Sequence, residues 1–296
     1  MNQNKGGTAR GREPAEAATP ALVTQLNELL QRRLREAIGN DRFGGLGQLA
    51  DWREGLVEGI DVAHLEQRHH ALRSRLARPE CAMALALNSF LPWHGHMAGL
   101  RLCGTEGFTD LQFDGRCPTG VRGTPPHVDV IAAGSKGVVG ACVRVYDYLG
   151  LRPSVMSAGY RTLAVGAGMS AWAELLSEAA AFRYLDVAAL AKIAIGLGRI
   201  FTRRPVRLLY LFLEPEQAAA LHFAGHRAEL AQAIARTAGS LVTLDGRSLH
   251  ELWRDWCVGS APATVRASAS ELSRRYGVVL PPAGRSTEGW LARRRD

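Results

Sequence analysis

The sequence predicts a single mixed-sheet α/β core with a helical extension on its N-terminal side. Apolar residues make up 47% of the 296 residues, a share that suits a packed globular protein. Helical patterns come first along the chain, then strands in sequence, and finally helices and strands in alternation. This order favours a mixed sheet flanked by helices.

The N-terminal part of the chain predicts a polar arm followed by helices. Residues 1–18 are polar and rich in Gly, Ala and Pro, which indicates a disordered arm. Leucines then recur at helical spacing from Pro20 until Gly39, as in an amphipathic helix. A polar helical stretch is expected over Leu56–Leu76, and the compact apolar run Cys81–Leu91 predicts a buried helix.

The middle of the chain predicts the sheet. Leu111–Arg116, His127–Ala132 and Val138–Tyr146 have strand character, and a Gly-Ser-Lys-Gly turn joins the second to the third, so these segments are expected to form a meander. The nearly uninterrupted apolar run Val206–Leu213 suits a strand buried on both faces. A short last strand is expected over Leu241–Leu244.

Helical patterns surround these strands, and they lie at Ser170–Phe182, Leu185–Leu197, Glu216–Ala238 and Ser248–Cys257. After Gly259 only one short helical stretch is expected, near Ala269–Tyr276, at the periphery. The expected organisation is a disordered arm (1–18), a helical N-terminal region packed on the core (19–110), the core (111–258) and a basic, largely irregular tail (259–296).

The composition narrows the class of protein. The net charge is +8, and the only lysines are Lys5, Lys136 and Lys192, so arginine carries most of the positive charge. Arginine binds phosphate in a bidentate manner, and a basic balance favours nucleic acid as a partner. A GC-rich genome, whose codons favour Arg and Ala, explains the same composition equally well.

The expected location is the cytoplasm. No apolar run has the length of a bilayer span, and the first twenty residues lack the apolar core of a secretory signal. The five cysteines are scattered and never form a CxxC pair, which argues against a disulfide framework and a thiolate zinc site. His94 and His96 flank one glycine, but without a third ligand a solvated turn is the simpler interpretation.

One motif carries the chemistry of the chain. Gly123–Asp129 is a rigid Pro-Pro turn that delivers Asp129 onto a strand. Side chains alternate between the two faces of a strand, so Cys142 and Arg144 on the next strand share a face and can lie beside Asp129.

This arrangement resembles the PD-(D/E)xK nuclease superfamily, and more narrowly a group of bacterial restriction-endonuclease-like proteins. The similarity covers about Cys81 to Trp256. It is carried by Asn88–Pro92, Pro118–Asp129, Val138–Leu149, Tyr184–Asp186 and Arg204–Pro215. The resemblance implies a restriction-endonuclease-like mixed sheet, and an aspartate and a second acid that bind Mg²⁺ beside a lysine that supports catalysis.

The chain departs from that pattern at several positions. Asp129 matches the motif aspartate, whereas Cys142 stands at the place of the second acid and Arg144 at that of the lysine. Mg²⁺ prefers oxygen ligands over thiolate, and arginine cannot release a proton near neutral pH. Ala189 and Ile193 likewise replace a glutamine and a histidine of the family. A site of the usual kind is therefore not expected.

Three interpretations remain open from the sequence. Asp114 could supply a second carboxylate and Lys192 the missing lysine, which would give an active Mg²⁺-dependent DNA nuclease with Asp129 and Asp114 as metal ligands. Alternatively, the protein binds DNA with hydrolysis impaired or lost. In the third, it is an inert structural or protein-interaction module in which Asp129 pairs with Arg144. Asp147, five residues after Cys142, is expected to face the other side of the strand.

The expected function is that of a DNA-associated, restriction-endonuclease-like protein whose metal-dependent phosphodiester hydrolysis is impaired or lost. Mg²⁺ is the expected cofactor only if the protein is active. DNA is the expected partner, a homodimer remains an open alternative, and no membrane partner is expected.

Overall fold

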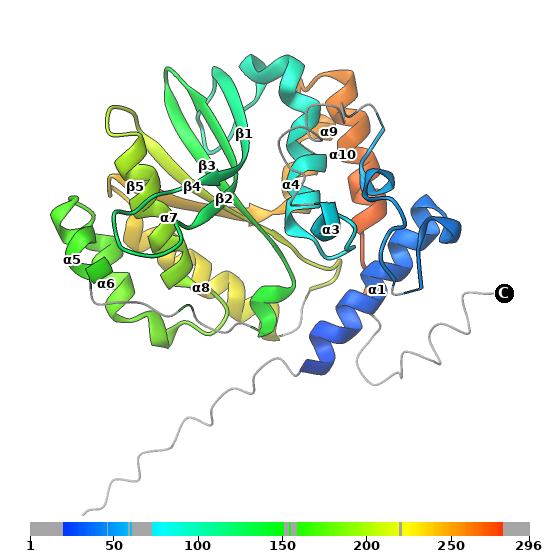
Figure 1. Ribbon diagram of the computed structural model, residues 1–296, viewed down its shortest axis with the longest axis horizontal. Helices are drawn as coiled ribbons and strands as arrows, with labels where there is room; N and C mark the ends of the chain where they lie inside the picture. Colours follow the sequence, from blue (N-terminus) through cyan, green and yellow to red (C-terminus); the bar gives the residue numbers. More distant parts are fainter. Residues whose placement is uncertain are drawn as a thin grey trace, which may run out of the picture.

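The computed structural model describes residues 20–45, 47–58, 60, 73–150, 154, 159–218 and 221–280. They form an α/β fold in which a five-stranded mixed sheet is flanked by helices (Figure 1). The predicted arm at 1–18, residues 61–72 of the predicted polar helix and the end of the tail from residue 281 lie outside the described residues.

The helices are α1 (Pro20–Ile38), α3 (Arg73–Leu76), α4 (Ala82–Phe90), α5 (Gly159–Gly166), α6 (Ser170–Ser177), α7 (Val187–Ile200), α8 (Leu221–Thr237), α9 (Leu249–Val258) and α10 (Ala263–Tyr276). Short 3₁₀ segments are η1 (Asn40–Arg42), η2 (Trp52–Gly55), η4 (Leu91–Gly99), η5 (Asp147–Gly150) and η6 (Ala179–Ala181). The strands are β1 (Phe108–Arg116), β2 (His127–Gly134), β3 (Gly137–Val145), β4 (Val206–Leu213) and β5 (Val242–Ser248). Nowhere in these described ranges does a helix combine the length and apolarity of a bilayer span.

The strands follow their order in the chain across the sheet, β1-β2-β3-β4-β5. β1, β2 and β3 form the predicted antiparallel meander, and β4 and β5 continue the sheet in parallel with β3. An antiparallel pair needs only a tight turn, whereas the parallel pairs need crossover connections, which here contain α5 to α7 and α8. The predicted mixed α/β fold class is confirmed.

Neighbouring residues of β4 show that helices cover both faces of the sheet. Tyr210 points toward α8, where its hydroxyl lies 3.2 Å from His226 Nε2. The preceding Leu209 faces the opposite side and lines a cavity together with Leu252 of α9. Because side chains alternate along a strand, α8 and α9 lie on opposite faces, and both central strands are almost entirely buried. Figure 1 shows α5 to α8 on one side of the strands and α4, α9 and α10 on the other.

The strand predictions were most accurate where the apolar pattern was unbroken. β4 has its predicted bounds. β1 begins three residues earlier than predicted, because Phe108 is buried and pairs with Gly134. β5 continues to Ser248 instead of ending at Leu244. Its last residues are polar and hide the strand pattern, but they pair with the apolar part of β4.

Within the predicted tail (259–296), α10 includes the helical stretch predicted near Ala269–Tyr276 and corrects the prediction that this stretch is short and peripheral. α10 is 14 residues long and buries Val265, Leu272 and Tyr276. It packs against α9, α1 and α4. The prediction failed because arginine, serine and alanine dominate the helix and leave only a narrow apolar stripe.

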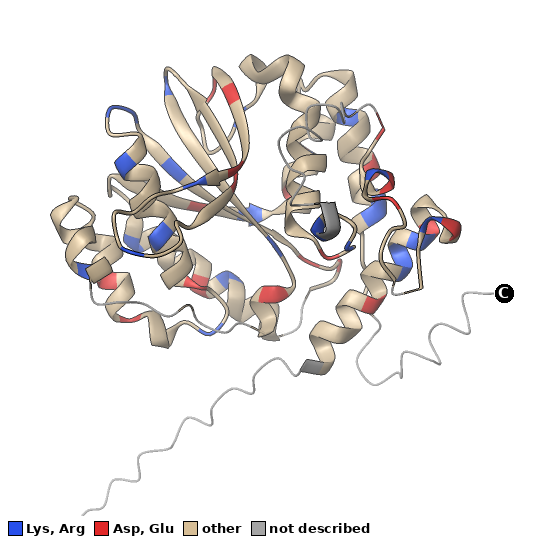
Figure 2. Ribbon diagram, in the orientation of Figure 1, with Lys and Arg blue, Asp and Glu red and all other residues tan. Residues whose placement is uncertain are grey.

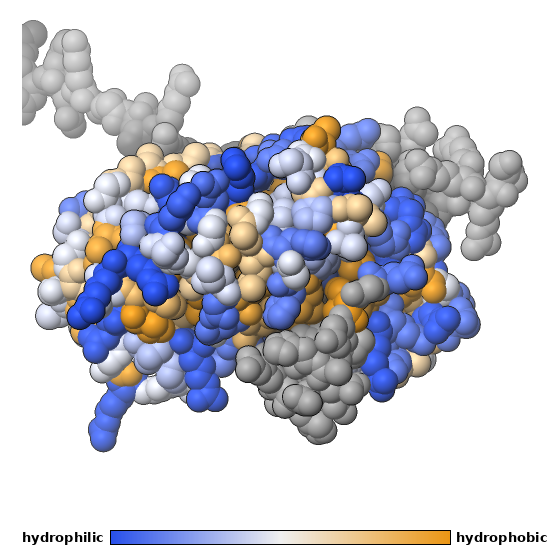
Figure 3. Space-filling view, turned by 90° about the horizontal axis from the view of Figure 1, so that it is seen from above, coloured by the Kyte–Doolittle hydropathy of each residue, from blue (hydrophilic) through white to orange (hydrophobic). Residues whose placement is uncertain are grey.

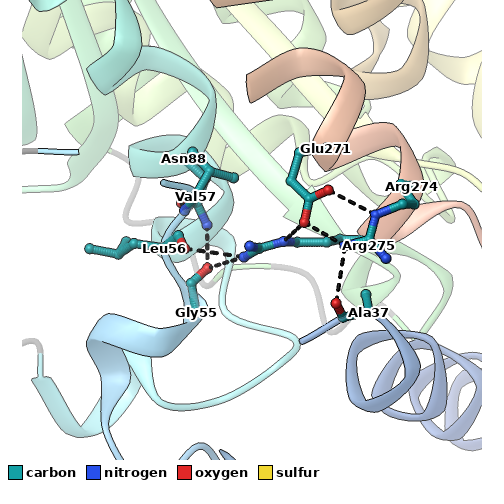
Figure 4. A network of polar contacts seen from close by, with 8 residues as sticks. All are labelled: Ala37, Gly55, Leu56, Val57, Asn88, Glu271, Arg274 and Arg275. Atoms are coloured by element: carbon teal, nitrogen blue, oxygen red, sulfur yellow. Dashed lines mark hydrogen bonds and ion pairs between the residues drawn. The ribbon is translucent and has the colours of Figure 1, made fainter. Parts of the chain in front are cut away.

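A polar network fixes α10 to the N-terminal region (Figure 4). The Arg275 side chain donates from Nε to Glu271 at 2.6 Å and from Nη1 to the carbonyl oxygens of Gly55 and Leu56, both at 3.2 Å. Asn88 of α4 joins the same segment by donating to the Gly55 carbonyl at 2.9 Å. The buried arginine therefore satisfies the Leu56 carbonyl and shares the Gly55 carbonyl with Asn88.

This network predicts unequal effects for two neighbouring arginines. Arg275→Gln is expected to lower the free energy of unfolding by about 1–3 kcal/mol, because the buried Leu56 carbonyl loses its donor and Glu271 loses one of its two arginines. Arg274→Gln is the matched control: its side chain is 48% exposed, so a loss of less than about 1 kcal/mol is expected. Urea denaturation of both variants measures the difference, and equal losses would contradict the assigned role of Arg275.

Candidate functional site

The motif aspartate lies where β2 and β3 stop pairing. Regular antiparallel pairing runs from Gly134 opposite Gly137 to Val130 opposite Ala141. Beyond this point a side chain replaces the backbone pairing: Asp129 Oδ2 accepts a hydrogen bond from the Val143 backbone N–H at 2.8 Å. The carboxylate thus serves a backbone group of the neighbouring strand.

Cys142 lies beside this carboxylate but cannot replace an acid. Its thiol is buried, at 1% exposure, and its register partner on β4 is Tyr210. Burial raises the pKa of the Cys142 thiol far above its usual value, so the thiol stays neutral. A neutral thiol does not bind a hard cation, because the thiolate is the metal ligand and it suits softer metals.

Arg144 pairs with Asp147 and not with Asp129. Among the described residues its ion-pair partner is Asp147, whose Oδ2 lies 3.7 Å from Arg144 Nε, and Nη1 donates to the Val143 carbonyl at 2.9 Å. The sequence-based expectation that Asp147 faces away was wrong, since β3 ends at Val145 and Tyr146 has a left-handed backbone with φ of 56°. Strand alternation stops there, and Asp147 returns toward Arg144.

Asp114 approaches Asp129 from β1. In the register of β1 and β2 it falls between Phe113 opposite Val130 and Gly115 opposite Val128, so it lies across from Asp129. Its own Oδ1 lies 2.8 Å from His127 Nδ1.

Several groups act on the Asp129 carboxyl. Burial raises the pKa of Asp129 above its ordinary value, the charge of Arg144 and the Val143 N–H lower it, and the charge of Asp114 raises it. Burial dominates, and the direction is upward. The structure therefore brings Asp129, Asp114, Cys142 and Arg144 into one region of the sheet.

Lys192 contacts an aromatic ring of α5. It lies on α7 with its Nζ 5.5 Å from the centre of the Tyr160 ring. The charged groups that act most strongly on the Asp129 carboxyl are Arg144, Asp114 and Asp147. The role of Lys192 as a displaced catalytic lysine stays a prediction.

The residues of this region do not fit a magnesium site of the usual nuclease kind. Asp129 and Asp114 are the only carboxylates of the predicted ligand set, and each already has a protein partner. Within the described ranges no group of three or more His, Cys, Asp or Glu side chains could hold a metal ion. Mg²⁺ in proteins is bound by carboxylate and other oxygen ligands in octahedral geometry, and the neutral thiol of Cys142 supplies no such ligand at the position of the second acid.

A buried aromatic cluster behind the site was missed in the sequence. His226 of α8 stacks on Tyr148 with ring centres 4.0 Å apart and reaches the Tyr210 hydroxyl. Burial lowers the pKa of His226 to about 3, so the imidazole is neutral and acts as a packing group. No sequence signal distinguishes His226 from other histidines of an amphipathic helix.

A separate cavity lies away from this region. It has a volume of about 760 Å³ and is lined by residues of η4 and α10, including His94, His96 and Arg275. The two histidines are exposed on η4. Neither the sequence nor the cavity supplies a third metal ligand for them from the described residues.

The position of Asp129 predicts different results for two substitutions. Asp129→Ala is expected to lower the free energy of unfolding by about 1–3 kcal/mol, because the buried Val143 N–H loses its acceptor. Asp129→Asn keeps an acceptor and removes the charge, so its stability at pH 7 is expected to equal or exceed that of the wild type.

The same variants have an expected pH dependence. Because the folded-state pKa of Asp129 is raised, the wild type loses stability relative to Asp129→Asn as pH rises through that pKa. At low pH, where the carboxyl is protonated in both states, the two proteins are expected to converge. Denaturant unfolding at a series of pH values measures this, and a stability gap that widens on acidification would contradict it.

The sequence was also compared with known proteins. No family model matches it, and neither a curated protein nor a solved structure shows significant similarity to it.

Proposed function

We propose that this protein is a cytoplasmic, DNA-associated protein of restriction-endonuclease-like type whose hydrolytic site has become a structural cluster. One observation carries the proposal: the Asp129 carboxylate accepts the Val143 N–H at 2.8 Å, in the place that a metal ligand would occupy in the resembled family. Beside it stand a neutral thiol at Cys142 and a guanidinium that pairs with Asp147.

The loss of hydrolysis follows from the chemistry of these groups. Phosphodiester cleavage of the resembled kind needs a metal ion that activates water and offsets charge on the phosphate. Cys142, at the position of the second acid, carries no charge near neutral pH, and Arg144, at the position of the lysine, releases no proton there. An active nuclease that uses Asp114 and Lys192 remains the competing function, and the mutual approach of Asp114 and Asp129 is the observation in its favour.

DNA association is supported by charge. The net charge of +8 is carried mainly by arginine, whose planar guanidinium suits phosphate oxygens. A DNA-binding protein releases counterions when it binds, so its affinity falls steeply with salt. An inert structural module has no reason to show this dependence.

The expected result is salt-sensitive DNA binding without metal-dependent cleavage. Fluorescence anisotropy with a labelled duplex of about 20–30 base pairs should give a linear fall of log affinity with log salt, with a slope of about −0.9 for each phosphate contacted. EDTA, Mg²⁺ and Mn²⁺ at constant ionic strength should give the same affinity. Supercoiled plasmid incubated with either metal should remain uncut.

The Asp129→Asn variant separates the candidates. Under the proposal it binds DNA as tightly as the wild type. Metal-dependent cleavage by the wild type that Asp129→Asn abolishes would establish the nuclease instead. Absence of DNA binding at low salt would leave the structural module as the remaining function.

A further inference from the structure

We infer that the nucleic-acid backbone binds to a basic loop surface formed by residues 117–126, α5 and α7. The inference rests on the proposed function and goes further, since it assigns the place of binding. The surface is defined by Arg122, Arg161, Lys192 and Arg199. It continues directly into β2, which begins at His127, so it adjoins the region of Asp129.

The two ends of the 117–126 loop are joined by a hydrogen bond, and the base of the loop packs on α7. The Cys117 backbone N–H donates to the Pro126 carbonyl at 2.8 Å, and Cys117 itself is buried. Its base lies directly on α7, since a Cβ built on Gly196 would be 2.3 Å from the Cys117 carbonyl oxygen. Only glycine at this position permits the close approach.

Further contacts join the loop to both helices. Thr119 Oγ1 donates to the Tyr160 hydroxyl of α5 at 3.5 Å, and Tyr160 in turn lies below Lys192. Gly120, with φ of 85°, packs on the Arg199 guanidinium, whose Cζ would be 3.1 Å from a Cβ at that position. The three segments therefore present one continuous surface.

The charge of this surface is of one sign. Residues 117–126, α5 and α7 contain four basic residues and no Asp or Glu. The side chains of Arg122, Arg161 and Arg199 are exposed, and within the described part of the chain no carboxylate forms an ion pair with any of these three. Figure 2 shows basic positions on α7 and on the loop that crosses in front of it. Unpaired, exposed guanidinium groups are what a phosphate backbone requires.

Several arginines elsewhere in the described residues are neutralised by carboxylates. On α10, Arg274 and Arg275 both pair with Glu271. Figure 3 shows one face of the molecule, where hydrophilic side chains alternate with small hydrophobic patches. On this face hydropathy alone marks no binding site, so the basic loop surface is assigned from its exposed arginines and its lack of acidic residues.

A second group of arginines provides the rival location. Arg101, Arg247 and Arg254 line a cavity of about 470 Å³ between β5 and α9. Asp245 and Glu251 line the same cavity, and Arg101 and Arg247 form ion pairs with Glu106 and Asp255. The net charge of this second location is therefore lower than that of the basic loop surface. The same group supplies a control with the same number of substitutions.

The test compares two triple variants of the full chain. Arg122→Gln/Arg161→Gln/Arg199→Gln removes the exposed charges of the basic loop surface, and Arg101→Gln/Arg247→Gln/Arg254→Gln removes an equal charge at the rival location. The first is expected to weaken duplex binding at least tenfold at about 0.1 M salt and to reduce the salt slope by about 3, since each arginine accounts for about one released counterion. The control variant is expected to change the affinity for the duplex by less than about threefold.

Additional variants and additional ligands check this result. A triple arginine-to-lysine variant at the basic loop surface keeps the charge and is expected to retain most of the binding, and the single Arg122→Gln variant gives a smaller loss should the triple variant fold poorly. Circular dichroism checks the fold of every variant. Single-stranded DNA and duplex RNA identify the preferred nucleic acid, and inorganic polyphosphate serves as competitor.

The outcomes are distinct. If the wild type does not bind DNA, the proposed function is wrong, and the inference that rests on it is wrong as well. If it binds but the control triple loses affinity while the loop triple does not, or both lose it equally, the inference is overturned and the proposed function stands. Polyphosphate that displaces DNA as effectively as unlabelled duplex, at equal phosphate concentration, would also overturn the choice of nucleic acid as the partner.

Discussion

The burial of two central strands on both faces is the constraint that governs the rest of this structure. β3 and β4 lie between α7 and α8 on one side and α4 and α9 on the other. An ionised side chain in such a layer must find a partner or become neutral, because removing a charge from water costs more than packing returns. The polar residues Cys142, Asp129 and Arg144 of the candidate site each meet this requirement by a different contact or protonation state.

Three residues of that site show three solutions. Cys142 remains a neutral thiol. Asp129 accepts a backbone N–H where the ladder between β2 and β3 ends. Arg144 reaches the end of its strand and pairs with Asp147, which returns because Tyr146 adopts a left-handed conformation. Together these contacts stabilise the region where β2 and β3 stop pairing.

Arginine has two separate uses in this chain. Arg275 is buried and joins the C-terminal helix to Gly55 and Leu56. Arg122 and Arg199 are exposed on segments that contain no acid. A cation of the first kind contributes to folding, and one of the second kind remains available for an anionic partner. The net charge of the sequence counts both kinds alike, so only their surroundings separate them.

The sequence by itself determined the mixed α/β class, the bounds of β4 and the placement of Asp129 on a strand next to Cys142 and Arg144. These features depend on local periodicity and on turn residues, which are visible in the chain. Tertiary structure decided the rest: the partner of Arg144, the packing of α10 and the union of the 117–126 loop with α7. Each depends on contacts between residues distant in sequence or on a single left-handed residue, and no local pattern records either of them.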